Sequence, residues 1–275
     1  MLNELLSAWP ILIALMVTGV FAGILAGLLG VGGGIVIVPV LYFLLQFFDV
    51  SPTSAIEIAV ATSLAIIVPT AISSIRAHYF KGNVDLPILK WWSGFILVFA
   101  VIGSLLITYV NGESLTLMFG VIAVCVSLNL LFRASAPSLF SELPSKLWQG
   151  VMASLTGLLS VMIGIGGGTL GVPLLTSFNV KTHRAVGTAA AFGLVIALPA
   201  VITLLLVGQA PTDAPFGNFG LVNVPAFLAM VPLTVMFAPV GARIGATLDQ
   251  AQLKRVFAVA LLITGSRMLY QVASL

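Results

Sequence analysis

Two glycine blocks of the same form lie far apart in the chain, and each interrupts an apolar stretch. The first occupies residues 30–34 (Gly-Val-Gly-Gly-Gly) and the second residues 164–168 (Gly-Ile-Gly-Gly-Gly). The offset of 134 residues between them also separates Pro39 from Pro173. Glycine clusters that break hydrophobic segments at corresponding points of two halves are typical of substrate sites in membrane transporters.

Each block has the chemistry of an anion site. Three successive glycines have no Cβ, so the chain can turn sharply and its peptide N–H groups can approach a ligand. A short apolar segment follows each block, and a helix that begins there presents partial positive charge and unpaired N–H donors. The alternative is that the glycines only allow close helix packing, but their matched placement favours binding. We predict that a small anion contacts Gly32, Gly33, Gly34, Gly166, Gly167 and Gly168.

Hydroxyl groups and one cation are further candidates for this site. Thr62, Thr169 and Thr188 lie near the expected cavity, although hydroxyls in membrane helices often bond only the preceding turn. Arg267 lies inside the last apolar segment, where the first half has Asn129. We include both positions in the predicted anion site, with Arg267 as a counter-charge. The alternative is that the Arg267 side chain reaches the membrane surface.

Other kinds of active site have little support. No Lys-Ser or Lys-Thr pair directly follows either glycine block, so the lysine and the Mg²⁺ ligand of a nucleotide-binding loop are absent from the positions where that loop needs them. An H-E-x-x-H motif is also absent. We interpret Cys125 as a core residue, and His78 and His183 as solvated loop residues. We therefore expect no enzymatic activity, no cofactor, no metal ion and no nucleic-acid partner.

The composition predicts an all-α integral membrane protein. Apolar residues make up 60% of the chain, charged residues make up 7%, and the mean hydropathy is +1.21. These values lie far outside the range of water-soluble domains. The apolar stretches have the lengths of helices rather than barrel strands. We expect a polytopic bundle of 8 to 10 membrane segments at about residues 8–29, 35–48, 55–75, 88–110, 114–132, 147–163, 169–178, 185–207, 221–241 and 252–273.

The ten segments divide into two similar halves of five. Residues 59–62 (Ala-Val-Ala-Thr) resemble residues 185–188 (Ala-Val-Gly-Thr). We predict a first membrane repeat at residues 1–132, a cytoplasmic linker at 133–146 and a second membrane repeat at 147–275. Five residues of the first half recur at a common offset of 138, and the pairs are Val84 with Val222, Pro87 with Pro225, Gly103 with Gly241, Leu115 with Leu253, and Phe119 with Phe257.

The charges predict how the halves are oriented. Because five is an odd number, a direct repeat in the sequence becomes an inverted-topology repeat in the membrane. Cytoplasmic loops carry an excess of lysine and arginine. Successive connections between segments lie on alternate sides of the membrane, and one of the two possible assignments places the following cations in the cytoplasm: Arg76, Lys81, Lys90, Arg133, Lys146, Lys181, Arg184, Arg243, Lys254 and Arg255. The same alternation leaves outside Glu4, Asp49, Glu57, Glu113 and Asp213. Both termini are then outside, and Arg267 is the exception to the rule.

The sequence resembles the TauE/SafE family, also called the 4-toluene sulfonate uptake permease family. The resemblance rests on the doubled Gly-x-Gly-Gly-Gly with its downstream proline, the Ala-Val-x-Thr segments, and Gly-Ala-Arg at residues 241–243. It covers about residues 10–272. It implies a prokaryotic cytoplasmic-membrane (inner-membrane) permease or exporter of sulfite, sulfoacetate or other organosulfonates, coupled to the proton gradient.

The residues and the resemblance agree on one hypothesis. A small anion binds near the midplane between the two glycine loops, and rocking of one repeat against the other exposes it to each side in turn. The lipid bilayer and the anionic solute are the expected partners, and the protein is a monomer or a homodimer. An anion channel and a non-transporting membrane subunit are the alternatives.

Overall fold

The computed structural model describes residues 2–30, 32–133, 138–245 and 250–274. Within these ranges the chain forms ten α-helices and one two-stranded hairpin. The elements are α1 (Leu2–Leu29), α2 (Gly34–Phe47), α3 (Pro52–Tyr79), α4 (Leu86–Ile107), α5 (Gly112–Arg133), α6 (Lys146–Met162), α7 (Gly168–Ser177), α8 (Thr182–Val207), β1 (Asn218–Phe219), β2 (Val222–Asn223), α9 (Val224–Ile244) and α10 (Gln250–Ala273). Each of the ten predicted segments is a helix, which confirms the predicted fold class.

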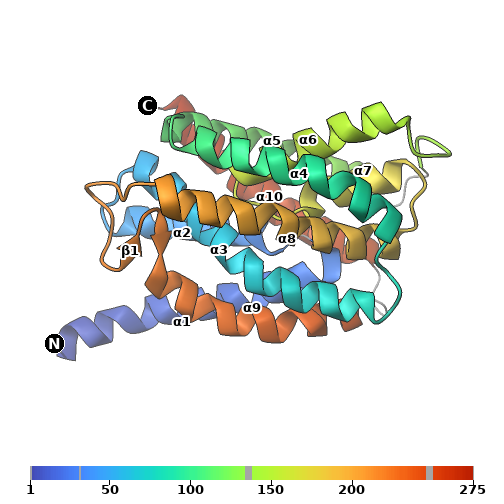
Figure 1. Ribbon diagram of the computed structural model, residues 1–275. Helices are drawn as coiled ribbons and strands as arrows, with labels where there is room; N and C mark the ends of the chain where they lie inside the picture. The colour runs from blue at the N-terminus through green and yellow to red at the C-terminus, as the bar shows by residue number, and fades with distance from the viewer. Residues whose placement is uncertain (1, 31, 134–137, 246–249, 275) are drawn as a thin grey trace.

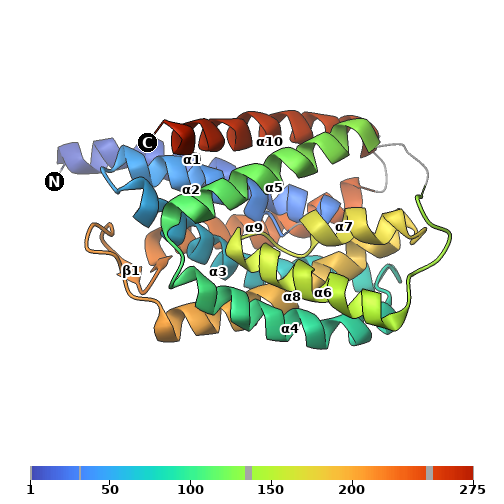
Figure 2. The same cartoon turned by 90° about the horizontal axis from the view of Figure 1, so that it is seen from above.

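The helices run along a common direction and connect two ends of an elongated bundle (Figure 1). Both termini and the β1–β2 hairpin lie at one end, which we call the hairpin end. The α3–α4 connection and the start of α8 lie at the other end, which we call the basic end because Lys81, Lys181 and Arg184 lie in these segments. Figure 2 shows α5 and α10 along one edge of the bundle and α4 along the opposite edge.

Helix packing pairs elements from the two halves of the chain. α1 packs along α9, and α4 packs along α6. α3 and α8 pack on each other, as do α5 and α10. Thus the four most extensive pairings all join the first five helices to the last five.

Local sequence explains where several long helices begin. Ser51, Asp85 and Asn223 are the N-cap residues of α3, α4 and α9, and each side chain accepts a hydrogen bond from a backbone N–H in the first turn. A proline follows within the first two helical positions in all three cases. Proline is tolerated there because the first N–H groups of a helix have no intrahelical acceptor.

α2 and α7 are too short to cross a membrane alone. α2 has 14 residues and α7 has 10, which correspond to about 21 Å and about 15 Å of helix. A hydrocarbon core is about 30 Å thick. Each short helix follows a glycine loop that turns the chain back after α1 or α6. Gly33 at φ 80° and Gly164 at φ 66° hold the left-handed conformation that these turns need.

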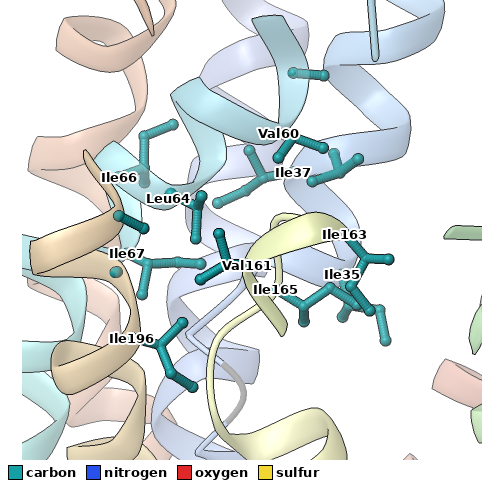
Figure 3. Close-up of a cluster of buried hydrophobic side chains, with 14 of the residues drawn as sticks. Ile35, Ile37, Val60, Leu64, Ile66, Ile67, Val161, Ile163, Ile165 and Ile196 are labelled. Atoms are coloured by element: carbon teal, nitrogen blue, oxygen red, sulfur yellow. The ribbon is translucent and has the colours of Figure 1, made fainter. Parts of the chain in front are cut away.

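Six helices within the described ranges are long and apolar enough to cross a membrane: α1 from Trp9, α3, α4, α5 to Phe132, α8 and α9. α3 is the most enclosed of the six, and its side chains form much of the apolar core. Figure 3 shows part of this core, where Val60, Leu64 and Ile67 of α3 gather with Val161 of α6 and Ile165 of the second glycine loop. The glycine loops are therefore embedded in a hydrocarbon environment.

Two residues lie in surroundings that differ from the prediction. His78 is buried within α3, and its Nε2 lies 2.8 Å from the carbonyl oxygen of Gly27; α3 continues to Tyr79, beyond the predicted helix end. Cys125 is exposed on α5 rather than in the core. α5 approaches α10 through Gly120 and Ala123, so position 125 lies on another face of the helix.

Candidate functional site

The two glycine loops, residues 30–34 and 164–168, meet in the interior. A Cβ placed on Gly34 would overlap the carbonyl oxygen of Gly164, and one on Gly32 would lie 3.4 Å from the Cα of Gly166. The described residues of both loops are buried. The loops therefore touch through backbone atoms, and only glycine fits at Gly34.

α3 holds the two loops together. The Ser63 hydroxyl donates a hydrogen bond of 2.8 Å to the carbonyl oxygen of Gly164. The Ile67 side chain, one turn further along, would contact a Cβ on either Gly32 or Gly34 at about 3 Å. One face of α3 thus fixes the second loop through a hydrogen bond and the first loop through packing.

Each loop also packs on a helix from the other half of the chain. A Cβ on Gly30 would overlap the carbonyl oxygen of Val186 in α8, and one on Gly164 would lie 2.8 Å from the Cα of Val60 in α3. The two valines occupy corresponding positions of the Ala-Val-x-Thr segments. The same contact therefore occurs twice, with the halves exchanged.

Both short helices begin at the loops without a side-chain cap. Gly33 and Gly167 are the N-cap residues of α2 and α7, and neither has a side chain to accept from the first-turn N–H groups. Among hydrogen bonds between described residues, the amides of Gly166 and Gly167 donate to no acceptor. A helix N-terminus of this kind attracts negative charge.

The threonines of the Ala-Val-x-Thr segments form a second matched pair of contacts. The Thr62 hydroxyl accepts a hydrogen bond of 2.9 Å from the backbone amide of Asn223, and the Thr188 hydroxyl accepts one of 2.8 Å from the backbone amide of Asp85. Asn223 and Asp85 are the N-cap residues of α9 and α4. Thr62 therefore ties α3 to the start of α9, and Thr188 ties α8 to the start of α4. In both cases the two helices come from different halves of the chain.

The matched contacts differ in charge. At the basic end, the Asp85 carboxylate forms an ion pair of 2.7 Å with Arg184. At the hairpin end, the neutral Asn223 occupies the corresponding position. Its side-chain amide donates a hydrogen bond to the side-chain oxygen of Asn218 instead. The contact at the basic end is therefore reinforced by charge, whereas the contact at the hairpin end is held by neutral groups.

Thr169 is the predicted hydroxyl residue that directly follows a glycine loop in the chain. It is in the first turn of α7, is 3% exposed, and its hydroxyl has no hydrogen-bond partner among the described residues. Ser160 of α6 is fully buried and also lacks a partner for its hydroxyl. The carbonyl of Ser160 accepts from the amide of Ile165 at 2.8 Å, which places Ser160 where the second loop begins. Sequence reasoning missed Ser160; its position four residues before Gly164 is the signal that could have identified it.

Arg267 and Asn129 are exposed on α10 and α5. The Arg267 guanidinium carbon lies 4.8 Å from the centre of the Phe43 ring, a cation–π contact on the surface of α2. All lysines and arginines whose side chains are described are exposed. As far as the described side chains show, the environment of the loops is therefore formed by backbone, hydroxyl and hydrocarbon groups.

A cavity of about 500 Å³ lies toward the hairpin end. Its walls come from α1, α2, α3, the start of α9 and the loop before β1, and they are mostly apolar. Thr62 and Asn223 are its polar members. The loop before β1 is tied down by Asp213, which accepts hydrogen bonds from the Ser54 hydroxyl at 2.6 Å and from the Ser51 amide at 2.8 Å.

Comparison with known proteins gives a consistent match over nearly the whole chain. The family model described as sulfite exporter TauE/SafE matches residues 15–268. A probable membrane transporter protein of Haemophilus influenzae is 30% identical, with 94% of this chain and 97% of that protein covered. Probable membrane transporter proteins of Methanocaldococcus jannaschii (27% identical, 97% of each chain) and Bacillus subtilis (26%, 94% of this chain and 97% of that protein) are also similar. No solved structure gives a significant match.

Proposed function

The chain belongs to the TauE/SafE family of multi-pass membrane proteins, and we propose that it is a secondary-active transporter of small anions. We assign sulfur-containing anions as substrates, namely sulfite, sulfoacetate or other organosulfonates. The family description names a sulfite exporter, and the names of the relatives point to a membrane transporter rather than an enzyme. Chemically, a sulfonate or sulfite suits the site because its several oxygens can accept hydrogen bonds from two helix ends.

One observation carries the proposal: two uncapped helix N-termini begin at glycine loops that touch in the buried interior. Non-helical backbone at membrane depth is tolerated where protein or a water cavity surrounds it, and broken helices at a repeat interface are the usual place for a transporter substrate. The anion binds between these loops, where the backbone amides of Gly32–Gly34 and Gly166–Gly168 are its donors.

The helix pairings support an inverted repeat of residues 1–132 and 147–275. Exchanging the halves converts the α1–α9 pair into the α6–α4 pair, and maps the α3–α8 and α5–α10 pairs onto themselves. The hydrogen bond of Thr62 to Asn223 likewise maps onto that of Thr188 to Asp85. Two such units can rock about α3 and α8, and this rocking moves access from one end of the bundle to the other.

The unequal ends define two gates. We place the basic end in the cytoplasm, because lysine and arginine gather there, and both termini outside. In this proposal the ion pair of Asp85 with Arg184 closes the cytoplasmic gate. The 500 Å³ cavity is the outer vestibule, and its floor is Thr62, the neighbour of the loop-binding Ser63. Proton coupling supplies the driving force.

Ligand-induced stabilisation of the detergent-purified protein tests this assignment. Sulfite, sulfate, thiosulfate, sulfoacetate, taurine, methanesulfonate, toluenesulfonate, phosphate and acetate are each added, and the melting temperature is measured. A ligand at about 100 times its dissociation constant adds roughly 2.7 kcal/mol. We expect selective stabilisation by a sulfur anion, lost in Gly167→Val, whose new side chain would meet the Ala189 carbonyl oxygen. A folded wild-type protein that no anion stabilises would contradict the proposal.

A further inference from the structure

The two glycine loops differ in the polar side chains that flank them. The second loop is flanked in the chain by Ser160 and Thr169, whose side chains are buried, whereas the positions 134 residues earlier are Ala26 and Ile35. Figure 3 shows Ile35 among the hydrocarbon side chains of the core. The α7 side of the site therefore offers hydroxyl donors, and the α2 side offers only backbone at the corresponding places.

Both hydroxyls stand out because they are buried and unpaired. Thr169 is 3% exposed and Ser160 is fully buried, and neither hydroxyl has a hydrogen-bond partner among the described residues. A buried hydroxyl without a partner destabilises the folded protein, so each such group calls for an explanation, such as a bound ligand, an ion or a water molecule. Thr156, one turn before Ser160 in α6, shows the ordinary arrangement: its hydroxyl donates to the Met152 carbonyl at 2.7 Å.

No basic side chain accompanies these donors within the part of the chain whose side chains are described. Every lysine and arginine with a described side chain is exposed, and apart from Tyr42 the buried ionisable groups among described residues are His78 and Asp85. Both of these lie toward the basic end, His78 in the last turns of α3 and Asp85 at the start of α4. An anion at the second loop would be held by neutral dipoles alone.

Neutral dipoles discriminate between anions by charge. The cost of removing an ion from water rises with the square of its charge. Its attraction to a fixed set of N–H and O–H dipoles rises only in proportion to the charge. Doubling the charge therefore worsens the balance between lost hydration and dipole attraction, so a site of neutral dipoles favours a monoanion with a spread charge over a dianion.

We infer that the transported anion is singly charged and binds unequally, on the α7 side of the paired loops, with the Ser160 and Thr169 hydroxyls as direct donors. This inference rests on the proposed anion transport and narrows its substrate class. Organosulfonates with no second ionised group, such as methanesulfonate, and hydrogensulfite satisfy it; sulfate, the doubly charged form of sulfite, and sulfoacetate with its ionised carboxylate do not.

Thermal stabilisation of the full-length protein in detergent tests the inference, with methanesulfonate and sulfate as probes at equal ionic strength. We expect methanesulfonate to stabilise the wild-type protein and sulfate not to. Thr169→Val and Ser160→Ala should each weaken methanesulfonate binding about tenfold, yet should raise the melting temperature without anion because an unpaired hydroxyl is removed. Thr156→Val is the matched control, and it should keep the wild-type response to methanesulfonate.

The outcomes separate this inference from the proposed function. If sulfate stabilises as strongly as methanesulfonate, or if both hydroxyl variants respond as the wild type does while Gly167→Val does not, the loops bind an anion but the inference is wrong. If no anion stabilises the folded wild-type protein, both fail. Sulfite gives an internal check: its stabilisation should shrink as rising pH converts hydrogensulfite to the dianion, and growth with pH would contradict a monoanion site.

Discussion

Replacement of Gly34 by alanine tests the contact between the two glycine loops. The added Cβ would overlap the carbonyl oxygen of Gly164 and would lie 2.9 Å from both the Ser63 Oγ and the Ile67 Cδ1. The isoleucine can move, but the carbonyl oxygen is backbone and accepts the Ser63 hydrogen bond. Overpacking typically costs 1–3 kcal/mol, and loss of that hydrogen bond adds about 1 kcal/mol. We expect a total destabilisation of roughly 2–4 kcal/mol.

Gly94→Ala is the matched control, because Gly94 is also helical and a Cβ there would meet nothing within 4 Å. Helix propensity makes this change neutral or stabilising, by up to about 1 kcal/mol. Thermal unfolding in detergent measures both variants, and a loss of 2 kcal/mol corresponds to a fall of about 4–8 °C in Tm. Equal melting temperatures for Gly34→Ala and Gly94→Ala would refute the loop contact.

Three further predictions concern the contacts at the two ends. Arg184→Ala should destabilise the basic end by about 1 kcal/mol, since Arg184 is half exposed; a double-mutant cycle with Asp85→Asn that shows no coupling would contradict the gate. Thr188→Val should cost about 1–3 kcal/mol in chemical unfolding, because the buried Asp85 amide loses its acceptor; a neutral result would contradict the locking role. The Ser54 hydroxyl, followed by Ser51, lowers the pKa of Asp213 from 3.8 to about 2. The ionised Asp213 carboxylate therefore stabilises the folded protein fully above about pH 4, and this contribution is lost as the pH falls toward 2. Asp213→Asn should abolish this pH dependence at a cost below about 1 kcal/mol. A wild-type profile that is flat over this range would oppose this assignment.

The glycine loops and the short helices could be predicted because they depend on local chemistry. Residues 30–34 and 164–168 break apolar segments whatever tertiary fold the chain adopts, and α2 and α7 begin at Gly34 and Gly168. The overlap of Gly34 with the Gly164 carbonyl could not be predicted, since it depends on how α3 brings two distant segments together. A hydrophobic pattern states which residues are buried, but not which of them touch.

Polar residues showed the limits of sequence reasoning most clearly. Thr62 and Thr188 looked like substrate ligands, yet in the structure each hydroxyl accepts from an N-cap amide of the other half. The sequence did not single out Ser160, because what distinguishes this residue is the lack of a partner for its hydroxyl among the described residues. His78 follows a predicted helix end, but it is buried because α3 continues past that point. In each case the decisive fact is which partner is within reach.

Counterflow of labelled sulfite in proteoliposomes tests most directly whether the paired loops carry an anion by alternating access. Liposomes preloaded with unlabelled sulfite should take up the label faster than empty ones, with saturation, for the wild-type protein and Gly94→Ala. Gly34→Ala should insert into liposomes but lose this accelerated uptake. Uptake that does not saturate, or that is insensitive to preloading, would identify a channel, and equal counterflow in the two glycine variants would contradict the account of the site.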